Sequence, residues 1–560
     1  MRHVTNAGLR LRALPLLLGL ALLGACARGR AEPGSTASPM ESADAGPGLQ
    51  TIHAAGVEWS VDYFPIGVMS AADAEGRWHL RVHLEGGRVT RYEHVGPSGQ
   101  VHKTSGIVYD ADGGSTRRVV NGYGVEVETI RLTKEGRESR IARSGNPLSE
   151  GCAQFIYTLD AHGDSVGRAC VDGEGHPNVD ANGCVRLGLT FDPPHVLVAR
   201  RCLDERGEPA LDTDGVHLSR YTRDARTQLT SERYFDRKEG ATLSVHGCAA
   251  RQFDYDAAGN LSNVTCLGAD GSPASYPNST VVGERRVFDA NGCMLAFHYV
   301  DTRGARASFG KWSGSVFTRD LFCSETSRET RDASDAIVSA FAKESARWQY
   351  VLDAQGQLTE QRCFDAKGKP WSCHQVTKIG GGGSVLRFAY DDRGRLVSTK
   401  AFDAAGRPAR RLAAYPHETV YRHDDRGLVV EAEHRDAAGK PSPALGNVAR
   451  VTYAFNAQGA ETSQKQFDKD GAPVNGTTGA HELRRRYDES RRLEAIELRD
   501  AKGELVGRSD LIFNGVRWPN NAAELRIVRD GATTKNRFLD RSGNELKEVD
   551  CTSTAVRCER

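Results

Sequence analysis

Residues 247–279 read GCAARQFDYDAAGNLSNVTCLGADGSPASYPNS, and this stretch contains the elements that decide the fold. Phe253 and Tyr255 alternate with polar residues at period two, which places both on one face of a β-strand. A tight turn opens at Asp256, whose side chain can bond the backbone two residues on, and a second turn follows around Gly271. We therefore expect a β-hairpin followed by a further turn.

The double turn repeats along the chain. The residue that opens the first turn recurs about every 32 residues. These residues are Asp160, Asp192, Asp224, Asp256, Asp289, Asp320, Asp353, Asp391, Asp424, Asn456 and Asp488. A second turn usually opens twelve residues after the first, as in Asp353 and Asp365. Such a period predicts an all-β fold, a repetitive antiparallel β-sheet array of about eleven double-turn units that is open, coiled or partly shell-like.

The N-terminal residues read as a targeting segment. A basic start is followed by an apolar run over 13–25, which is too short to span a bilayer and is typical of a secretory signal peptide over 1–25. The sequence LGAC at 23–26 resembles a bacterial lipobox, and the resemblance implies that cleavage leaves Cys26 as a lipidated first residue. The alternative is an ordinary signal peptide with a chance cysteine. Residues 26–50 are predicted to be the lipidated cysteine and a flexible tether.

The remaining boundaries follow from the rhythm of the turns. We expect a degenerate N-terminal β cap over 51–150, the repeat array over 151–510 and a C-terminal cap over 511–560. Apolar residues at helical spacing predict a short helix over 334–348.

Twelve cysteines follow Cys26, and three pairs share one spacing of 18 residues. These pairs are Cys152 with Cys170, Cys184 with Cys202, and Cys248 with Cys266. Because metal-binding CxxC spacing is absent, we expect equivalent disulfides across hairpins in an oxidising compartment. Val216 with Tyr234 occupies the same two positions in a unit without the pair. The other expected pairings are Cys293 with Cys323 between units, and the local loops Cys363 with Cys373 and Cys551 with Cys558.

The segments YDAAGNL at 255–261 and YDDRGRL at 390–396 resemble the YD (RHS-type) repeat, Y-D-x-x-G-x-L. The resemblance implies long β-sheets that spiral into a shell. The 32-residue unit is longer than the usual YD unit, the chain is shorter than typical shell-forming members, and no recognisable protease core or toxin module follows. From this resemblance we therefore expect the β-repeat architecture, but neither the shell function nor the toxin activity of the family.

No catalytic set of residues stands out in the sequence. The sequence has no GxSxG elbow, no HExxH motif and no GK[ST] phosphate loop. The recurrent aspartates are predicted to cap turns. Calcium is the alternative where two carboxylates precede a glycine, at 110–113, 212–215 and 468–471. Histidines at scattered positions are expected in surface or turn roles, among them His217, His417 and His481. We expect neither a metal nor a cofactor.

Charge and localisation limit the partners. Lys plus Arg number 74 against 73 Asp plus Glu, and no basic stripe stands out along the sequence, so nucleic-acid binding is not expected. The expected location is the cell envelope, with a lipid anchor in the outer membrane and the array facing the periplasm or the cell surface.

The leading hypothesis is a non-enzymatic scaffold or binding surface for an envelope protein, peptide or glycan. One alternative is an RHS-related encapsulating or delivery component. The other is an envelope glycan hydrolase whose carboxylates are gathered by the fold.

Overall fold

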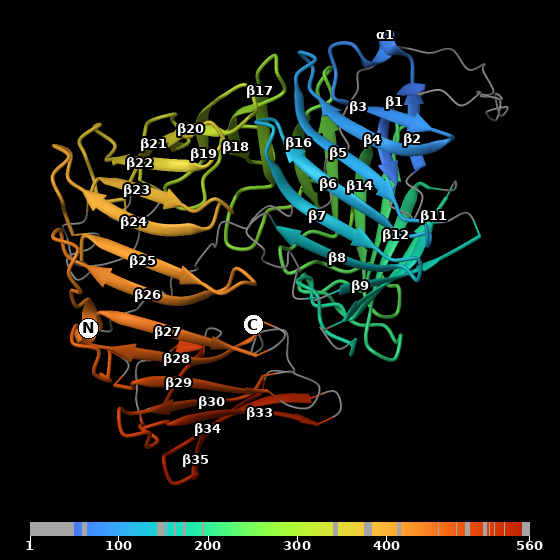
Figure 1. Ribbon diagram of the computed structural model, residues 1–560. Coiled ribbons are helices and arrows are strands. Elements are labelled where there is room, and N and C mark those ends of the chain that lie inside the picture. The colour runs from blue at the N-terminus through green and yellow to red at the C-terminus, as the bar shows by residue number, and fades with distance from the viewer. Residues whose placement is uncertain are drawn as a thin grey trace.

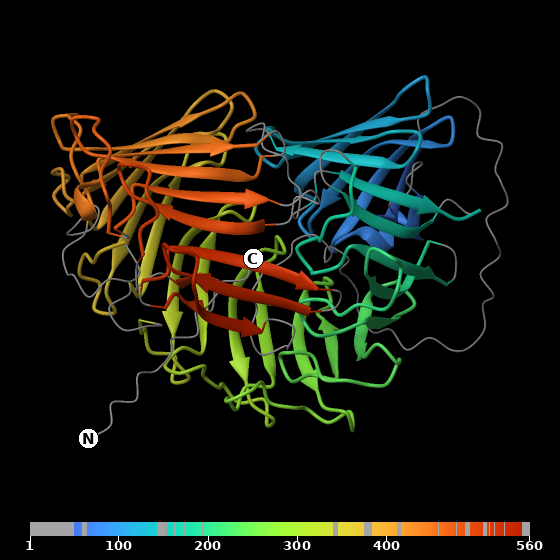
Figure 2. The same ribbon diagram turned by 90° about the horizontal axis from the view of Figure 1, so that it is seen from below.

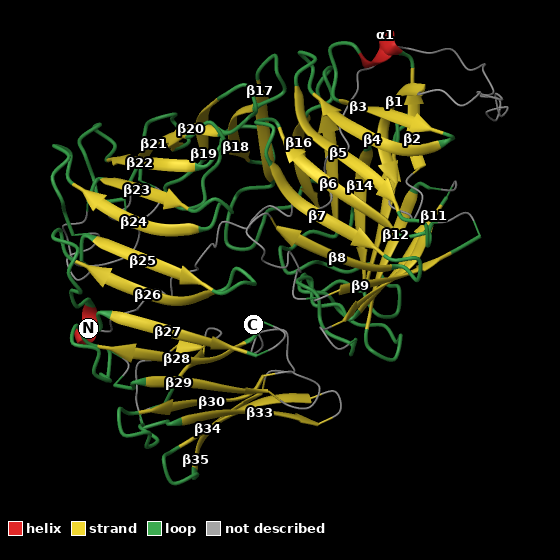
Figure 3. Cartoon of the chain, viewed as in Figure 1, coloured by secondary structure: helices red, strands yellow, loops and turns green. Residues whose placement is uncertain are grey.

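A computed structural model describes residues 50–58, 64–142, 152, 154–161, 164–171, 175–192, 195–339, 345–373, 383–410, 416–456, 459–477, 479–487, 493–507, 512–513, 516–519, 521–530 and 533–550. Its strands form one antiparallel sheet of 33 strands and one small two-stranded hairpin. Helical structure in the described residues is limited to α1, Ala71–Ala74, and a 3-10 turn at Leu445–Asn447 (Figure 3).

The strands of the N-terminal quarter are β1 Gln50–Glu58, β2 Phe64–Met69, β3 His79–Glu85, β4 Arg88–Val95, β5 Val101–Tyr109, β6 Ser115–Asn121, β7 Glu126–Leu132 and β8 Arg137–Ala142. The next are β9 Gln154–Leu159, β10 Ser165–Val171, β11 Arg186–Phe191, β12 Leu197–Leu203, β13 Leu218–Arg223, β14 Leu229–Phe235, β15 Ala250–Tyr255, β16 Leu261–Leu267, β17 Gly283–Phe288, β18 Met294–Val300, β19 Gly314–Arg319 and β20 Glu325–Arg331. The last are β21 Arg347–Leu352, β22 Leu358–Phe364, β23 Val385–Tyr390, β24 Leu396–Phe402, β25 Glu418–His423, β26 Val429–Arg435, β27 Arg450–Phe455, β28 Glu461–Phe467, β29 Glu482–Tyr487, β30 Leu493–Arg499, β31 Ile512–Phe513, β32 Val516–Arg517, β33 Glu524–Asp530, β34 Thr533–Leu539 and β35 Glu545–Asp550.

Neighbours in the sheet are neighbours in sequence. From β3 to β30, and then through β33, β34 and β35, each strand pairs antiparallel with the next, while β1 pairs with both β2 and β3. The described sheet therefore has two edge strands, β2 and β35. Figures 1 and 2 show that it curves continuously into a coil, which brings the N-terminal strands β3–β7 across the strands of the middle repeats. This confirms the all-β repetitive array in its open, coiled form.

One unit shows why the sequence folds this way. In β15 and β16, Phe253 lies opposite Val264 and Arg251 opposite Cys266, and a register shift precedes the turn at Tyr255. The positions of Arg251, Phe253 and Tyr255 are half-buried, whereas Gln252 and Asp254 between them are exposed. We call these two sides of the sheet the buried face and the exposed face. The alternation predicted from the sequence thus becomes a two-sided sheet.

The tyrosine of the YD pattern joins consecutive units. Tyr255 donates a hydrogen bond from its hydroxyl to the carbonyl oxygen of Leu229 in the preceding unit, at 2.9 Å. Tyr390 makes the same bond to Leu358, also at 2.9 Å. Where the position holds arginine, the guanidinium takes over, as in Arg223 to the carbonyl of Leu197. In these units the residue before the turn supplies a donor that reaches back to the previous hairpin, whereas other units have an apolar residue at this position, among them Phe191, Leu352 and Phe455.

The aspartates cap their turns. In one unit, Oδ1 of Asp353 accepts hydrogen bonds from the backbone N–H of Gln355 at 2.8 Å and of Gln357 at 2.9 Å. The second turn repeats the arrangement, with Oδ1 of Asp365 accepting from Lys367 at 2.8 Å and Lys369 at 2.9 Å. The carboxylate supplies acceptors for two turn N–H groups, as the sequence predicts.

Replacing Asp365 with alanine should lower the free energy of unfolding by about 1 kcal/mol, because two backbone donors lose their acceptor at a site that water can reach. Asp365→Asn retains the accepting oxygen and should lose much less. Chemical denaturation of the two variants measures the difference. Equal losses would mean that the carboxylate charge, and not the capping bond, stabilises the turn.

The helix predicted over 334–348 is wrong in its described parts. Oδ1 of Asp332 caps a second turn, and Ile337 forms a β-bridge with Arg331. Strand β21 already begins at Arg347, and residues 340–344 lie outside the described residues. Asp332 stands twelve residues after Asp320, so the repeat rhythm places a turn here. Trp348 lies opposite Cys363 on the buried face, which explains an apolar residue that also fitted helical spacing.

The two ends of the sheet differ in how they are covered. At the C-terminal end, an apolar cluster centred on the fully buried side chains of Trp518, Leu525 and Phe538 packs against Ile496 and Leu498 of β30. Strands β33–β35 thus continue the sheet, and the cluster closes its core with large apolar groups, while β31 and β32 form the separate hairpin. Those described in 51–150 continue it at the other end through β1–β8.

Where the sheet coils back on itself, loops of the N-terminal strands contact turns of the middle repeats that are far away in sequence. Trp78 donates from Nε1 to Oδ1 of Asn260 at 2.6 Å, although 182 residues separate them. Tyr123 donates its hydroxyl to Asp320, and its ring lies 4.6 Å from that of Phe322 between centroids. We call these contacts of the N-terminal cap with the first turns at 256–260, 289–293 and 320–324 the seam. The disulfide between Cys293 and Cys323 joins two of those turns.

Candidate binding hollow on the exposed face

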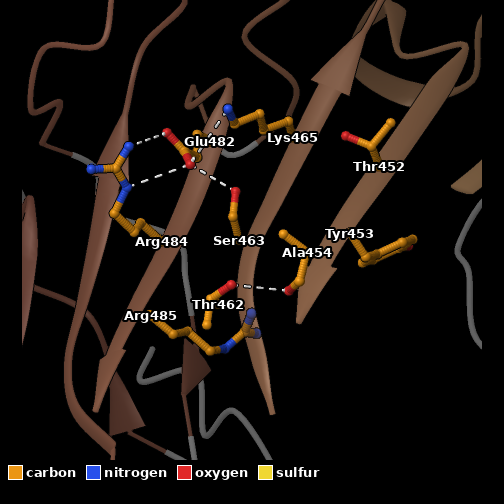
Figure 4. A pocket seen from close by; sticks show the side chains of 9 residues that line it. All are labelled: Thr452, Tyr453, Ala454, Thr462, Ser463, Lys465, Glu482, Arg484 and Arg485. Atoms are coloured by element: carbon orange, nitrogen blue, oxygen red, sulfur yellow. Dashed lines mark hydrogen bonds and ion pairs between the residues drawn. The ribbon is translucent and has the colours of Figure 1, made fainter. Parts of the chain in front are cut away.

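A hollow of about 440 Å³ lies across β27, β28 and β29 (Figure 4). Its walls carry hydroxyl and charged groups, and they are formed by Thr452, Tyr453, Ala454, Thr462, Ser463, Lys465, Glu482, Arg484 and Arg485. The register brings these residues together, because Lys465 of β28 lies opposite both Thr452 of β27 and Glu482 of β29. Thr452, Lys465 and Glu482 therefore share the exposed face, whereas Tyr453 and Arg485 have the same register position as Phe253 on the buried face.

Glu482 is the centre of the polar network. Its Oε1 accepts a hydrogen bond from Oγ of Ser463 at 2.7 Å, and its Oε2 pairs with Nη2 of Arg484 at 3.1 Å (Figure 4). Nζ of Lys465 lies 4.0 Å from Oε1. Burial by itself would raise the pKa of Glu482, but the bonds from Ser463 and Arg484 outweigh it and the pKa is lowered. The carboxylate is therefore ionised at neutral pH.

The cationic groups around Glu482 remain open to solvent. The side chains of Lys465 and Arg484 are 44% and 46% exposed, against 8% for Glu482. One buried negative charge thus holds two cations at the rim of the hollow. Thr452 and Thr462 also line it, and the hydroxyl of Thr462 donates to the carbonyl oxygen of Ala454 at 3.2 Å. Such a set can bind carboxylate or hydroxyl groups of a ligand by charge-assisted and neutral hydrogen bonds.

A related triad recurs two units earlier. Oγ of Ser398 donates to Oε1 of Glu418 at 2.7 Å, and Nζ of Lys400 lies 3.4 Å from the same oxygen. Sequence reasoning missed both triads. The signal is Ser-x-Lys on one return strand and Glu at the start of the next unit, and it is visible only after the pairing register between units is known.

The buried face is filled by its own side chains. Arg168 pairs with Asp180 at 2.9 Å and Arg200 with Asp212 at 3.0 Å. Burial raises the pKa of Tyr221 to about 12, so its phenol stays neutral at physiological pH. On this face, arginine and acid side chains therefore pair with one another.

The structure forms five disulfides. The three bonds Cys152–Cys170, Cys184–Cys202 and Cys248–Cys266 each have a Cα–Cα distance of 5.3 Å, as equivalent bridges across a hairpin should. Cys293–Cys323 links adjacent units, and Cys363–Cys373 closes a local loop. Cys26, Cys551 and Cys558 lie outside the described residues. Five such bonds fit an oxidising, extracytoplasmic compartment.

Val216 and Tyr234 occupy the bridge positions of a unit without cysteines. Both are buried, and they pack in one apolar cluster with Cys248 and Cys266 of the following unit. The disulfide of one unit thus packs against the apolar pair at the equivalent positions of its neighbour.

The paired aspartates proposed for calcium have other partners. Oδ1 of Asp112 accepts from the backbone of Gly114 at 3.0 Å, Asp214 faces His246 at 3.5 Å, and Asp470 pairs with Lys469 at 2.8 Å. Among the described residues, no three His, Cys, Asp or Glu side chains are placed to share a metal ion.

The histidines expected at the surface or in turns lie in the connectors between units, where each contacts a backbone carbonyl of the preceding hairpin. His217 and His481 are buried, and Nδ1 of His217 lies 2.9 Å from the carbonyl oxygen of Cys202. His417 and His481 make the same contact at 2.6 Å, to Ala401 and Gln466. A surface position was therefore wrong for His217 and His481, because the connector residues fold over the end of the preceding hairpin.

Across the part of the chain that the structure describes, no helix has the length and apolar character needed to cross a membrane.

No protein-family model and no curated protein sequence matches this chain. Among solved structures, a crystal structure of TcdB2-TccC3-TEV shares 12% identity over 84% of this chain, with a TM-score of 0.27. The Photorhabdus luminescens Tc holotoxin pore with a TccC3 mutation also shares 12% identity over 84%, with a TM-score of 0.25. This chain spans 27% of the length of each.

Proposed function

We propose that this protein is a lipid-anchored scaffold of the bacterial cell envelope that binds a carboxylate-bearing peptide or glycan on the exposed face of its repeat array. The observation that carries the proposal is the hollow across β27–β29, where Lys465 and Arg484 stand open to solvent around the buried Glu482. A sheet that extends without interruption gives such a site room for an elongated ligand.

The anchor in this proposal is Cys26. The lipobox resemblance at 23–26 supports it, and the five disulfides support export from the cytoplasm. Acylation of Cys26 by two or more chains would hold the protein stably at the outer membrane.

A binding role fits the hollow better than glycan hydrolysis. Glycosidases usually use two carboxyl groups that flank the scissile bond. Glu482 is the one carboxylate among the residues that line the hollow, and its hydrogen bonds from Ser463 and Arg484 keep it ionised. It is therefore suited to positioning two cations rather than to donating a proton.

The double variant Lys465→Gln, Arg484→Gln tests the proposal. We expect about tenfold or greater loss of affinity for carboxylate-bearing envelope fragments, such as muropeptides, because two charge-assisted hydrogen bonds are lost. Calorimetric titration of the full chain measures the change. The matched control is Lys400→Gln, which removes the equivalent lysine from the other triad and should leave binding intact.

Photo-crosslinking in native membranes supplies an independent test. A photoreactive residue at Thr452 lies in the hollow, whereas one at Gln252 has the same register position in another unit. The proposal expects adducts at Thr452 that decrease in the double variant. Identical adducts at both positions, or none at Thr452, would contradict it.

A further inference from the structure

Four arginines stand on the exposed face of four consecutive strands. Arg186 lies on β11, Arg201 on β12, Arg220 on β13 and Arg233 on β14. Arg220 is directly opposite Arg233, while Arg201 lies opposite Leu218, two residues from Arg220 on the same face. Arg186 lies opposite Leu203, two residues from Arg201. We call this set the arginine row.

The row has no acidic residue among the strand positions that surround it. The other exposed-face positions of β11–β14 are Gly188, Thr190, Ala199, Leu203, Leu218, Thr222, Ser231 and Phe235. The acid that reaches the row is Glu239 of a second turn, 2.8 Å from Arg220 and 3.6 Å from Arg201. In the described residues, neither Arg186 nor Arg233 has an ion-pair partner. The row therefore carries excess positive charge in a chain of net charge +1.

The Arg220–Arg233 pair works against the stability of the sheet. Like charges directly opposite each other on neighbouring strands are destabilising. Arg387 and Lys400 have the same arrangement in a later unit, but there Glu360 lies 2.8 Å from Arg387 and Glu418 lies 3.4 Å from Lys400. An external anion would supply at the row the neutralisation that the later unit contains in itself.

We propose that the arginine row binds the phosphate groups of an anionic lipid surface and lays the exposed face of β11–β14 against the membrane. The guanidinium fork matches phosphate oxygens in pairs. Strands about 4.8 Å apart spread the four arginines over roughly 15 Å, so the row can meet more than one headgroup. The choice of a membrane over another acidic partner rests on the proposed anchor at Cys26, which would hold the chain beside such a surface.

The test uses the full chain with Cys26→Ala, so that acylation cannot mask weaker binding. Co-sedimentation is measured with vesicles of phosphatidylcholine containing 30% phosphatidylglycerol, roughly an anionic envelope leaflet in charge. We expect binding that weakens as salt is added, and at least about tenfold weaker binding when Arg186, Arg201, Arg220 and Arg233 are all changed to glutamine. Vesicles of pure phosphatidylcholine should bind neither protein.

The matched control is Arg387→Gln with Lys400→Gln, which removes two cations from the same register positions and should bind vesicles as the parent does. Thermal unfolding should show little change in stability in the fourfold variant, because the repulsion relieved between Arg220 and Arg233 offsets the loss of the exposed ion pairs with Glu239.

Equal vesicle binding by the fourfold variant and its parent would overturn the proposal. Binding to soluble dextran sulfate but not to vesicles would also overturn it and would assign the row to a free acidic polymer. Mass spectrometry of the N-terminus of the membrane-isolated protein tests the anchor separately. An unmodified Cys26 would refute the anchor, and the arginine row would still be tested by the vesicle experiment.

Discussion

Replacing Gly292 with alanine is expected to open the seam and to lower the free energy of unfolding by about 3 kcal/mol. Gly292 has φ +80°, and a Cβ placed there would lie 2.3 Å from Nε1 of Trp78 and 2.8 Å from Cδ of Pro97. A methyl group therefore cannot be added unless the N-terminal cap moves away from the turn. The hydrogen bond from Trp78 to Asn260 would be lost with that movement.

Hydrogen exchange measures this effect directly. Amide protection should fall on both sides of the seam, in 78–102 and in 256–260, while the C-terminal hairpins stay protected. Gly271→Ala is the matched control, since Gly271 also has φ +80° and a Cβ there would meet nothing within 4 Å. Gly271→Ala should lower the free energy of unfolding by about 1 kcal/mol, which is the cost of the left-handed backbone alone. Equal losses in the two variants would show that the seam contributes little to stability.

Removing one repeat disulfide is expected to have an effect of similar size. The variant Cys248→Ala with Cys266→Ala should lose about 3 kcal/mol in the chain-entropy model, with a further loss from the space left in a fully buried site. Both cysteines are 0% exposed. Denaturant unfolding of the oxidised protein, followed through the protection of β15 and β16, measures the change.

The neighbouring unit supplies the control for this experiment. Val216 and Tyr234 fill the same two positions without a covalent bond. Cys248→Val with Cys266→Tyr should therefore recover part of the stability that the alanine variant loses, because it restores the buried contacts but not the cross-link. If the two variants were equally unstable, packing at these positions would be unimportant and the covalent bond alone would matter.

The local features of the fold could be predicted from the sequence because their causes lie within a few residues. Asp256 caps its own turn, Phe253 and Tyr255 alternate along one strand, and the pair Cys248 and Cys266 is separated by one hairpin. Each depends on turn chemistry and on the period of two that every β-strand has. The prediction of a helix over 334–348 was wrong, because apolar spacing in a short window cannot distinguish a connector followed by a strand from a helix.

The candidate hollow could not be found in this way. Glu482, Ser463 and Lys465 meet because of the register between units, which is set by three paired residues at each junction and not by a motif. The arginine row was missed because its members are 13 to 19 residues apart along the chain and join into one patch only across neighbouring strands.

The sequence by itself determined the repeated hairpin, its capped turns, its two-sided strands and the equivalent disulfides, since all of these follow from contacts within one unit. Only the tertiary structure decided which units meet across the coil, as Trp78 meets Asn260 and Tyr123 meets Asp320. The physical reason is that the small twist between each pair of strands accumulates over the whole sheet. Contacts between residues 182 and 197 positions apart therefore depend on the sum of many junctions, which no local pattern records.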